Sequence, residues 1–245
     1  MMVSKTIRNL ALFAIMALGA VALISACSQK PKGFEDQRAE MVRLQLKQRG
    51  ITDPAILKAF MTVPREEYVL PNFRNNSYDD VEAPIGHGQS LDRPYENAFM
   101  IRALALTPHD RVLEVGTGSG YLASLMSRIA KDVYSIEIEH PLAQESAERV
   151  RRLGYDNVHI KEGDGFIGWP ENAPFDAIVM TASPSEVPKP LAQQLAEGGR
   201  ILLPLGGTKK FQELVLYEKK DGVLLGPKML APTEFVPMKG KILEQ

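Results

Sequence analysis

The sequence predicts an α/β protein with a doubly wound, mostly parallel sheet, and three features favour this fold class. Short apolar runs that suit buried strands alternate with segments of helical periodicity between residues 111 and 205. A glycine-rich turn at 116–120 connects a strand directly to a helix. Two further runs, at 212–218 and 223–230, follow one another without a helix, which predicts an antiparallel strand pair at the C-terminal edge.

The first 27 residues have the pattern of a secretory signal. Lys5 and Arg8 precede an uncharged run at 10–26, which is somewhat short for a spanning helix of about 20 residues. The run ends at Cys27, the only cysteine of the chain. Its position after a Ser-Ala pair resembles a bacterial lipobox, in which the cysteine is acylated. This resemblance implies a mature chain that begins at Cys27 and is held at the membrane, on the periplasmic side, by its lipid.

Other origins of the same pattern stay open. An ordinary signal peptide and an uncleaved membrane anchor would look similar. Lys30, Lys32 and Arg38 follow the apolar run, so the charges also permit an inverted anchor that leaves the domain in the cytoplasm.

Residues 34–245 are predicted to form one domain, joined to the N-terminal segment by a polar tether at 28–33. The formal net charge of the chain is −1, with acidic and basic residues interspersed. No basic stripe is interleaved with aromatic residues, which argues against a nucleic-acid surface. A monomer is expected.

Two helices are predicted at the start of the domain. Residues 34–49 form an amphipathic pattern that ends at Gly50, and a second helix can be capped by Thr52 or Asp53. The stretch 63–93 is irregular and rich in Pro, Gly and Asn. Such a long stretch without periodicity in a compact domain is usually functional.

The parallel sheet is predicted to begin with a strand at 111–115, a helix at 121–130 and a strand at 133–138. The elements expected after these are a helix at 140–153, strands at 157–161 and 175–180, a helix at 188–197 and a strand at 200–205.

The glycine turn is the strongest indication of a ligand. Gly116, Gly118 and Gly120 leave it without side chains, so a ligand can lie against backbone N–H groups at a helix N-terminus. A dinucleotide fingerprint would place its third glycine where Tyr121 stands. The pattern is E-x-G-x-G-x-G instead, beginning at Glu114, and it resembles the nucleotide loop of class I S-adenosylmethionine-dependent methyltransferases.

Two further acidic positions fit a nucleoside ligand. Glu137 ends the strand after the turn, about 20 residues on, where an acidic residue binds ribose hydroxyls. Asp164 and Gly165 follow the next predicted strand, at the carboxyl edge where open α/β sheets bind ligands. On their own, these two residues are compatible with a plain turn.

Several segments together resemble the protein-L-isoaspartate O-methyltransferase family, over roughly residues 38 to 239. The most specific of them is Pro-Ile-Gly-His-Gly-Gln at 84–89. The others are 63–69, 110–121, 153–158, 163–165, 168–170, 173–178 and 235–237.

The resemblance implies a class I methyltransferase fold that transfers a methyl group from S-adenosylmethionine to the α-carboxylate of L-isoaspartyl residues, and so repairs damaged proteins. It also implies roles for the residues quoted above. The backbone at Gly116, Gly118 and Gly120 would hold the methionine part of the cofactor, with Glu114 supporting the loop, Glu137 at the ribose, and Asp164 with Gly165 at the adenine end.

The chain departs from this family in the expected acceptor site. The family typically reads Gly-Gln-Thr-Ile-Ser-Gln-Pro-Tyr, whereas residues 88–95 read Gly-Gln-Ser-Leu-Asp-Arg-Pro-Tyr. Ser90 keeps a hydroxyl at the threonine position, but Asp92 replaces the serine usually assigned to the active site. Ser90 and Asp92 are expected to line the site of the substrate carboxylate.

An ionised Asp92 would repel that carboxylate by about 4 kcal/mol at 4 Å and an effective dielectric constant of 20. Arg93 could neutralise Asp92, Asp92 could be protonated, or the acceptor could be a different group. If charge repulsion operates, Asp92→Ser should raise isoaspartyl methylation. A methyltransferase with another acceptor and a non-catalytic binding protein are the alternative functions.

Overall fold

A computed structural model describes residues 33–208 and 211–241. The predicted signal, Cys27 and the tether up to residue 32 lie outside these ranges, so the structure does not bear on them. No helix in the described ranges is both long enough and apolar enough to cross a membrane.

Seven strands form one sheet, in the order β5-β4-β3-β6-β7-β8-β9. The first five of these are parallel and the last two pair antiparallel, which confirms the predicted fold class. The bounds are β3 Arg111–Val115, β4 Asp132–Glu137, β5 Val158–Glu162, β6 Phe175–Met180, β7 Leu195–Leu205, β8 Gln212–Lys220 and β9 Val223–Thr233.

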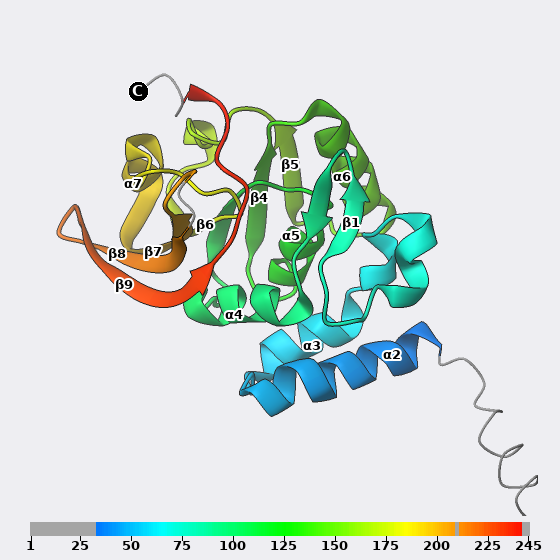
Figure 1. The fold of residues 1–245 in the computed structure, drawn as a ribbon. Coiled ribbons are helices and arrows are strands. Elements are labelled where there is room, and N and C mark those ends of the chain that lie inside the picture. Colours follow the sequence, from blue (N-terminus) through cyan, green and yellow to red (C-terminus); the bar gives the residue numbers. More distant parts are fainter. Residues whose placement is uncertain (1–32, 209–210, 242–245) are drawn as a thin grey trace, which may run out of the picture. The chain divides into compact units, whose positions relative to one another are not determined.

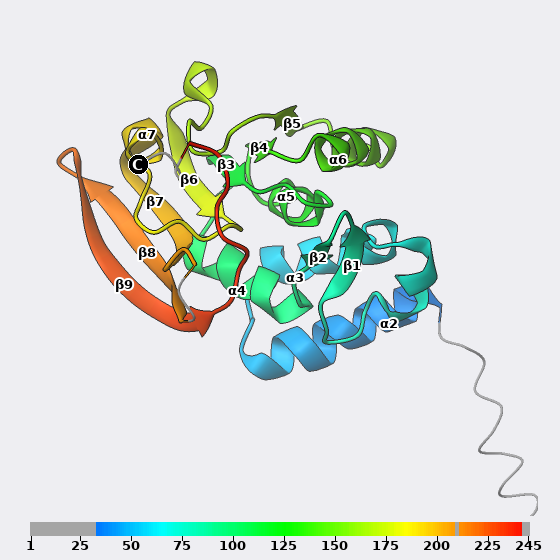
Figure 2. The ribbon, with the colours of Figure 1, turned by 45° about the horizontal axis from the view of Figure 1, so that its top comes forward.

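Helices cover both faces of this sheet. Figure 2 shows α4 (Pro94–Leu104) and α5 (Tyr121–Met126) on one face and α7 (Lys189–Gln194) on the other, while α6 (His140–Arg152) packs beside β4 and β5 (Figure 1). The chain runs from β3 through β4 to β5, then returns to β6 on the other side of β3. The carboxyl ends of β3 and β6 therefore flank the point where the winding reverses, which is where such sheets bind ligands.

The core is apolar on both sides of the central strands. Val112 and Leu113 on β3 and Ile178 on β6 are fully buried, as expected for parallel strands covered by helices on each face. Against this background, the buried carboxylate of Glu114 is the exception in β3.

The helix predicted at 34–49 is composite. It consists of α2 (Phe34–Met41), a π-helical turn η1 (Val42–Leu46) and a 3₁₀ turn η2 (Lys47–Arg49), and it ends at Gly50 with φ of 85°. The second helix is α3 (Pro54–Thr62), capped by Asp53, whose Oδ1 accepts hydrogen bonds from the N–H groups of Ala55 and Ile56.

The C-terminal end predicted for the helix at 188–197 was wrong. Helix α7 stops at Gln194, and residues 195–197 already belong to β7, with Leu195 paired to Phe175. The Nζ of Lys219 donates to the carbonyls of Ala192 and Leu195, at 3.1 and 2.7 Å, and so satisfies groups that a continuing helix would have bonded itself. The helix predicted at 121–130 is likewise shorter, because α5 ends at Met126.

The stretch 63–93 contains more structure than its sequence indicates. It forms two 3₁₀ turns, η3 (Arg65–Glu67) and η4 (Pro71–Asn76), and an antiparallel hairpin of β1 (Ala83–Gly86) with β2 (Gln89–Leu91). Neither the hairpin nor α4, which follows it, was predicted from the sequence.

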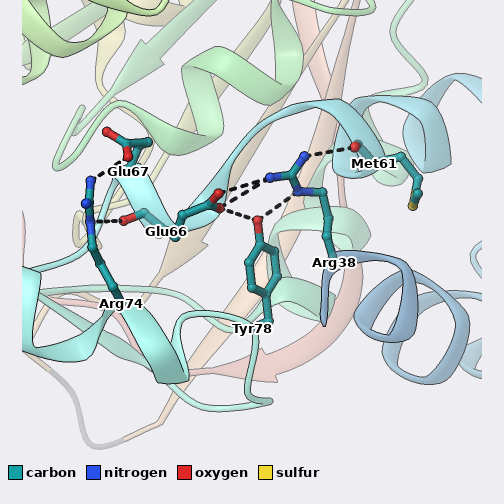
Figure 3. Close-up of polar contacts among 6 residues, drawn as sticks. All are labelled: Arg38, Met61, Glu66, Glu67, Arg74 and Tyr78. Atoms are coloured by element: carbon teal, nitrogen blue, oxygen red, sulfur yellow. Dashed lines mark hydrogen bonds and ion pairs between the residues drawn. The ribbon is translucent and has the colours of Figure 1, made fainter. Parts of the chain in front are cut away.

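Ion pairs and hydrogen bonds hold this stretch against α2 (Figure 3). The Nη2 of Arg38 donates to Glu66 Oε1 at 3.1 Å, and its Nε donates to the Tyr78 hydroxyl at 2.8 Å. Tyr78 in turn donates to Glu66, and the Nε of Arg74 donates to the Glu66 carbonyl at 3.1 Å. Because the partners come from far apart in the chain, the network fixes a segment that has little regular structure of its own.

Candidate active site

A cavity of about 570 Å³ opens at the carboxyl ends of β3 and β4. Its wall combines the glycine loop, the ends of both strands, the β2 strand with Asp92, and a C-terminal segment at 234–239. The predicted loop and the predicted acceptor residues, which are separated in the sequence by α4 and β3, therefore face one space.

The glycine loop takes a shape that side chains would prevent. Gly116, Gly118 and Gly120 have φ values of 100°, 53° and 83°, in the left-handed region. A Cβ at Gly116 would come within 3.0 Å of the Thr181 hydroxyl oxygen, which donates a hydrogen bond to the Gly116 carbonyl at 2.7 Å. The loop thus presents bare backbone to the cavity.

Glu114 lies buried beneath this loop. Its Oε2 accepts a hydrogen bond from the Ser135 hydroxyl, and Thr117 then donates to Ser135 at 2.6 Å. Its Oε1 is buried and has no hydrogen-bond partner among the described residues. Burial, together with the nearby charges of Glu137 and Asp92, raises the pKa of Glu114 to about 8, although the Ser135 hydrogen bond lowers it. A buried carboxylate oxygen without a partner suits a cationic ligand.

Glu137 ends β4 at the other side of the loop. Its Oε2 accepts from the Gly118 N–H at 2.8 Å, and its Oε1 accepts from the Glu139 N–H at 3.0 Å. The carboxylate therefore fixes the loop while it lines the cavity.

Gly165 lines the cavity and Asp164 does not. A Cβ at Gly165 would come within 3.0 Å of the Val115 side chain, so a larger residue there would displace the end of β3. The Asp164 carboxylate accepts from the N–H groups of Phe166 and Lys241, at 2.9 and 2.8 Å. The roles of Asp164 and Gly165 at an adenine ring stay predictions.

Ser90 and Asp92 both line the acceptor side of the cavity. The Ser90 hydroxyl donates to Glu82 Oε2 at 3.0 Å. The Asp92 side chain is half-buried, and among the described residues its carboxylate accepts one hydrogen bond, from Asn97 Nδ2 to Oδ2, at a long 3.4 Å. Burial, and then the charge of Glu96, raise the pKa of Asp92 to about 7, although the nearby Arg65 lowers it.

Arg93 does not neutralise Asp92. Its residue is exposed, and within the described ranges no ion pair joins the two side chains. Instead, the buried Arg65 lies behind Asp92, and its Nη2 donates to the Asp92 carbonyl at 2.7 Å. Pairing with Arg93, one of the three ways in which Asp92 could accommodate a carboxylate substrate, is therefore not observed.

The C-terminal segment 234–239 was not predicted to form part of the site, and we call it the strap. After β9 it crosses the sheet between β6 and the β1–β2 hairpin (Figure 2). The Ser183 N–H donates to the Val236 carbonyl and the Met238 N–H donates to the Ser183 carbonyl, at 2.8 and 2.9 Å. Lys239 pairs with Glu139 at 2.6 Å. The Phe-Val-Pro motif at 235–237 was the only sequence signal for it.

Residues missed by the sequence analysis also include Asn97 and Thr181, which line the cavity from α4 and from the end of β6. The Oδ1 of Asn97 is buried without a partner in the part of the chain that the structure describes. Neither residue belongs to a motif with a recognisable spacing, so no local pattern could have indicated them.

The cavity suits S-adenosylmethionine. Its charged sulfur and amino group would meet the unpartnered Glu114 oxygen, its amino-acid part the bare loop at Gly116–Gly120, and its ribose the carboxylate of Glu137. The seven-stranded sheet with antiparallel strands at its C-terminal edge, together with the glycine loop after β3 and the acidic residue ending β4, is typical of the class I methyltransferase fold.

Comparison with known proteins identifies the family within this class. The family model described as Protein-L-isoaspartate(D-aspartate) O-methyltransferase (PCMT) matches residues 36–243. Protein-L-isoaspartate O-methyltransferase 1 of Geotalea uraniireducens (strain Rf4) is 45% identical over 209 residues, which cover 85% of this chain and 95% of that protein. Protein-L-isoaspartate O-methyltransferase 2 of Anaeromyxobacter sp. (strain Fw109-5) is 48% identical over 207 residues, 84% of each chain. This chain belongs to the PCMT family.

Solved structures agree. A protein-L-isoaspartate O-methyltransferase superimposes with a TM-score of 0.76 at 32% identity, covering 84% of this chain and 67% of that one. A Plasmodium falciparum protein described as a putative protein-L-isoaspartate O-methyltransferase, in complex with S-adenosyl-L-homocysteine, superimposes with a TM-score of 0.72 at 27% identity. It covers 85% and 99% of the two chains.

Proposed function

We propose that this chain transfers a methyl group from S-adenosylmethionine to the α-carboxylate of L-isoaspartyl residues in damaged proteins. The observation that carries the proposal is one cavity that joins a cofactor loop to Ser90 in β2 and to Asp92, which follows β2, in a chain of the PCMT family. Its repair role follows from the activity by which its relatives are named.

The residues of this chain need to position the reactants more than activate them. When bound, S-adenosylmethionine supplies a methyl group on a positively charged sulfur. The acceptor carboxylate has a pKa of about 4, so it is already ionised near pH 7 and needs no general base. Holding the acceptor in line with the methyl group is worth roughly 7 to 11 kcal/mol in favourable cases. Glu114, Glu137 and the loop would hold the donor, whereas Ser90 and Asp92 would hold the acceptor.

The direct test is methyl transfer by the full chain in mild detergent. The substrates are an acetylated peptide that contains L-isoaspartate and its twin with normal aspartate. We expect the isoaspartyl peptide alone to be methylated. Binding of S-adenosylhomocysteine without transfer to either peptide would contradict the proposal and favour a changed acceptor. Absence of both binding and transfer would contradict a methyltransferase function altogether.

We further propose that the domain is exported and held at the membrane through a lipid on Cys27, and that it works as a monomer. The support is the basic, apolar and small-residue pattern of residues 1–27. An exported location raises the question of cofactor supply, because S-adenosylmethionine is made in the cytosol.

Metabolic labelling with a clickable fatty acid tests the anchor. The full chain should carry the label in the membrane fraction, and Cys27→Ser should lose it. A reporter fused at the C-terminus separates the two sides of the membrane, since alkaline phosphatase is active only after export. An unlabelled chain with an inactive reporter would support the cytoplasmic alternative. The molar mass of the detergent-free domain, measured by light scattering, tests whether the domain is a monomer.

A further inference from the structure

The Asp92 carboxylate lies close to several other acidic side chains. Glu82 precedes β1, Glu96 lies in the first turn of α4, and Glu114 lies in β3. The charges of Glu96 and Glu82 act on Asp92, and the charge of Asp92 acts on Glu114. Glu96 and Glu82 therefore disfavour a negative charge on Asp92.

One cation, Arg65, opposes them, but it does not pair with the Asp92 carboxylate. Arg65 is fully buried, and its Nε and Nη2 donate to the backbone carbonyls of Ser77 and Asp92, both at 2.7 Å. Its guanidinium carbon lies 5.0 Å from the centre of the Tyr121 ring. Two of its three nitrogens thus bond the main chain, the third, Nη1, has no hydrogen-bond partner among the described residues, and Arg65 forms no ion pair with Asp92 in the described structure.

The hydrogen bonds leave room for a proton on Asp92. Oδ2 accepts the long contact from Asn97, whereas Oδ1 accepts no hydrogen bond from any described residue. A substrate carboxylate that enters this cavity needs donors. The Ser90 hydroxyl already donates to Glu82, so its proton is directed away from the acceptor position. A hydroxyl on Asp92 would supply the missing donor at the wall of the cavity.

We propose that Asp92 works as a neutral carboxylic acid whose hydroxyl donates a hydrogen bond to the acceptor carboxylate, so that isoaspartyl methylation by this chain requires weakly acidic to neutral medium. This inference rests on the proposed function and specifies how its acceptor site tolerates an aspartate. The proton stays on Asp92 throughout the reaction, because the acceptor attacks as a carboxylate and becomes a neutral ester. Asp92 therefore positions the acceptor and is not a general acid.

The direction of the pH effect follows from the raised pKa of Asp92. Burial and the neighbouring carboxylates raise the pKa of Asp92 to about 7. Below that pH Asp92 is neutral and can donate; above it, Asp92 is ionised and repels the acceptor. The neutral fraction falls about tenfold for each pH unit above the pKa, and so about 100-fold by pH 9.

The test is the pH dependence of kcat/KM for the acetylated isoaspartyl peptide between pH 5.5 and 9. The full chain is used at saturating S-adenosylmethionine, and production of S-adenosylhomocysteine is measured. The peptide carboxylate is ionised over this whole range. We expect the unaltered chain to lose about 100-fold between its plateau and pH 9. Asp92→Asn, whose amide donates but does not titrate, should keep a flat profile, and Asp92→Ser should do the same.

Glu96→Gln is the matched control. Glu96 does not line the cavity, and its Oε2 accepts from the Arg93 N–H, which a glutamine oxygen can also do. Since the charge of Glu96 raises the pKa of Asp92, removing it should move the fall in activity to lower pH and leave the plateau unchanged. A merely structural role of Asp92 would produce neither this shift nor the flat profile of Asp92→Asn.

Two results would overturn the inference while leaving the proposed function intact. One is an active chain whose profile matches that of Asp92→Asn. The other is an Asp92→Asn variant at least tenfold faster than the unaltered chain at pH 6, which would mean that Asp92 is ionised there. An unaltered chain that binds S-adenosylhomocysteine and methylates no isoaspartyl peptide at any pH would overturn the proposed function itself.

Discussion

The cofactor half and the acceptor half of the cavity are built in different ways. In the cofactor half, Glu114, Ser135 and Glu137 lie on neighbouring strands, and the parallel pairing of β3 with β4 sets the spacing between them. The acceptor half depends on the stretch 63–93, which is fixed by side chains such as Arg65. The sheet can thus keep its cofactor while the acceptor wall changes, and the aspartate at 92 is such a change.

The largest expected effect is the loss of Arg65, which supports the acceptor half. Arg65→Ala would leave a cavity and two buried carbonyls, those of Ser77 and Asp92, without their donor. We expect the free energy of unfolding to fall by about 3 to 5 kcal/mol, measured by urea denaturation. Arg43→Ala, at an exposed ion pair with Glu40, should change it by less than about 0.5 kcal/mol. Similar losses for the two variants would mean that buried charge does not hold this half.

A glycine pair tests the cofactor half. Gly116→Ala should weaken binding of S-adenosylhomocysteine by about 100-fold or more in calorimetry, because the new Cβ would collide with Thr181 and deform the loop. Gly154 has a similar positive φ of 75°, but it has open space around it. Gly154→Ala should therefore weaken folding by about 1 kcal/mol and leave the affinity unchanged. Equal affinities for the two variants would show that the loop does not hold the ligand.

Glu137→Gln should weaken cofactor binding by about 10- to 100-fold, since hydrogen bonds to a charged group contribute about 1.5 to 3 kcal/mol. Its KM for the peptide at saturating cofactor should not change, because Glu137 lies in the cofactor half. Glu162 is the matched control, since it is the register partner of Glu137 on β5 and its half-exposed carboxylate contacts His140. An equal loss of affinity in Glu162→Gln would mean that the effect comes from the loss of one negative charge and not from a contact of Glu137 with the cofactor.

Stability against pH gives the smallest effect, taken per pH unit, and compares the halves directly, because each contains one acid whose pKa is raised. The pKa of Asp92 is raised to about 7 and that of Glu114 to about 8, from about 4 in the unfolded chain. An acid whose pKa is higher in the folded chain than in the unfolded chain stabilises the folded chain fully at pH values below its unfolded pKa. This stabilisation is lost as the pH rises through its folded pKa. Each group should therefore lower the free energy of unfolding by up to about 1.4 kcal/mol per pH unit between pH 5 and 7.

The two neutral variants separate these contributions. In urea denaturation at several pH values, Glu114→Gln and Asp92→Asn should each flatten the slope, and the double variant should flatten it further. A slope that neither variant changes would mean that both acids titrate normally in the folded chain.

Sequence patterns predicted the cofactor half better than the acceptor half for a physical reason. The strand at 111–115, the glycine turn and Glu137 form a local unit whose residues must have those types to fold that way. The β1–β2 hairpin has no such signal, since its strands are only four and three residues long and β1 contains Pro84 and Gly86. Its position depends on contacts such as Arg38 with Tyr78, which are 40 residues apart. The end of α7 was mispredicted for the same reason, because the Lys219 amine that ends it comes from another strand.

The strap has a consequence for the order in which the site is completed. All seven strands of the sheet precede residue 234, so they leave the ribosome before the residues that close the cavity. Within the described residues, the strap is joined to the end of β6 by the main-chain bonds of Ser183 to Val236 and Met238. One wall of the cavity is therefore added after the sheet in the chain, by a segment that belongs to no strand of the sheet.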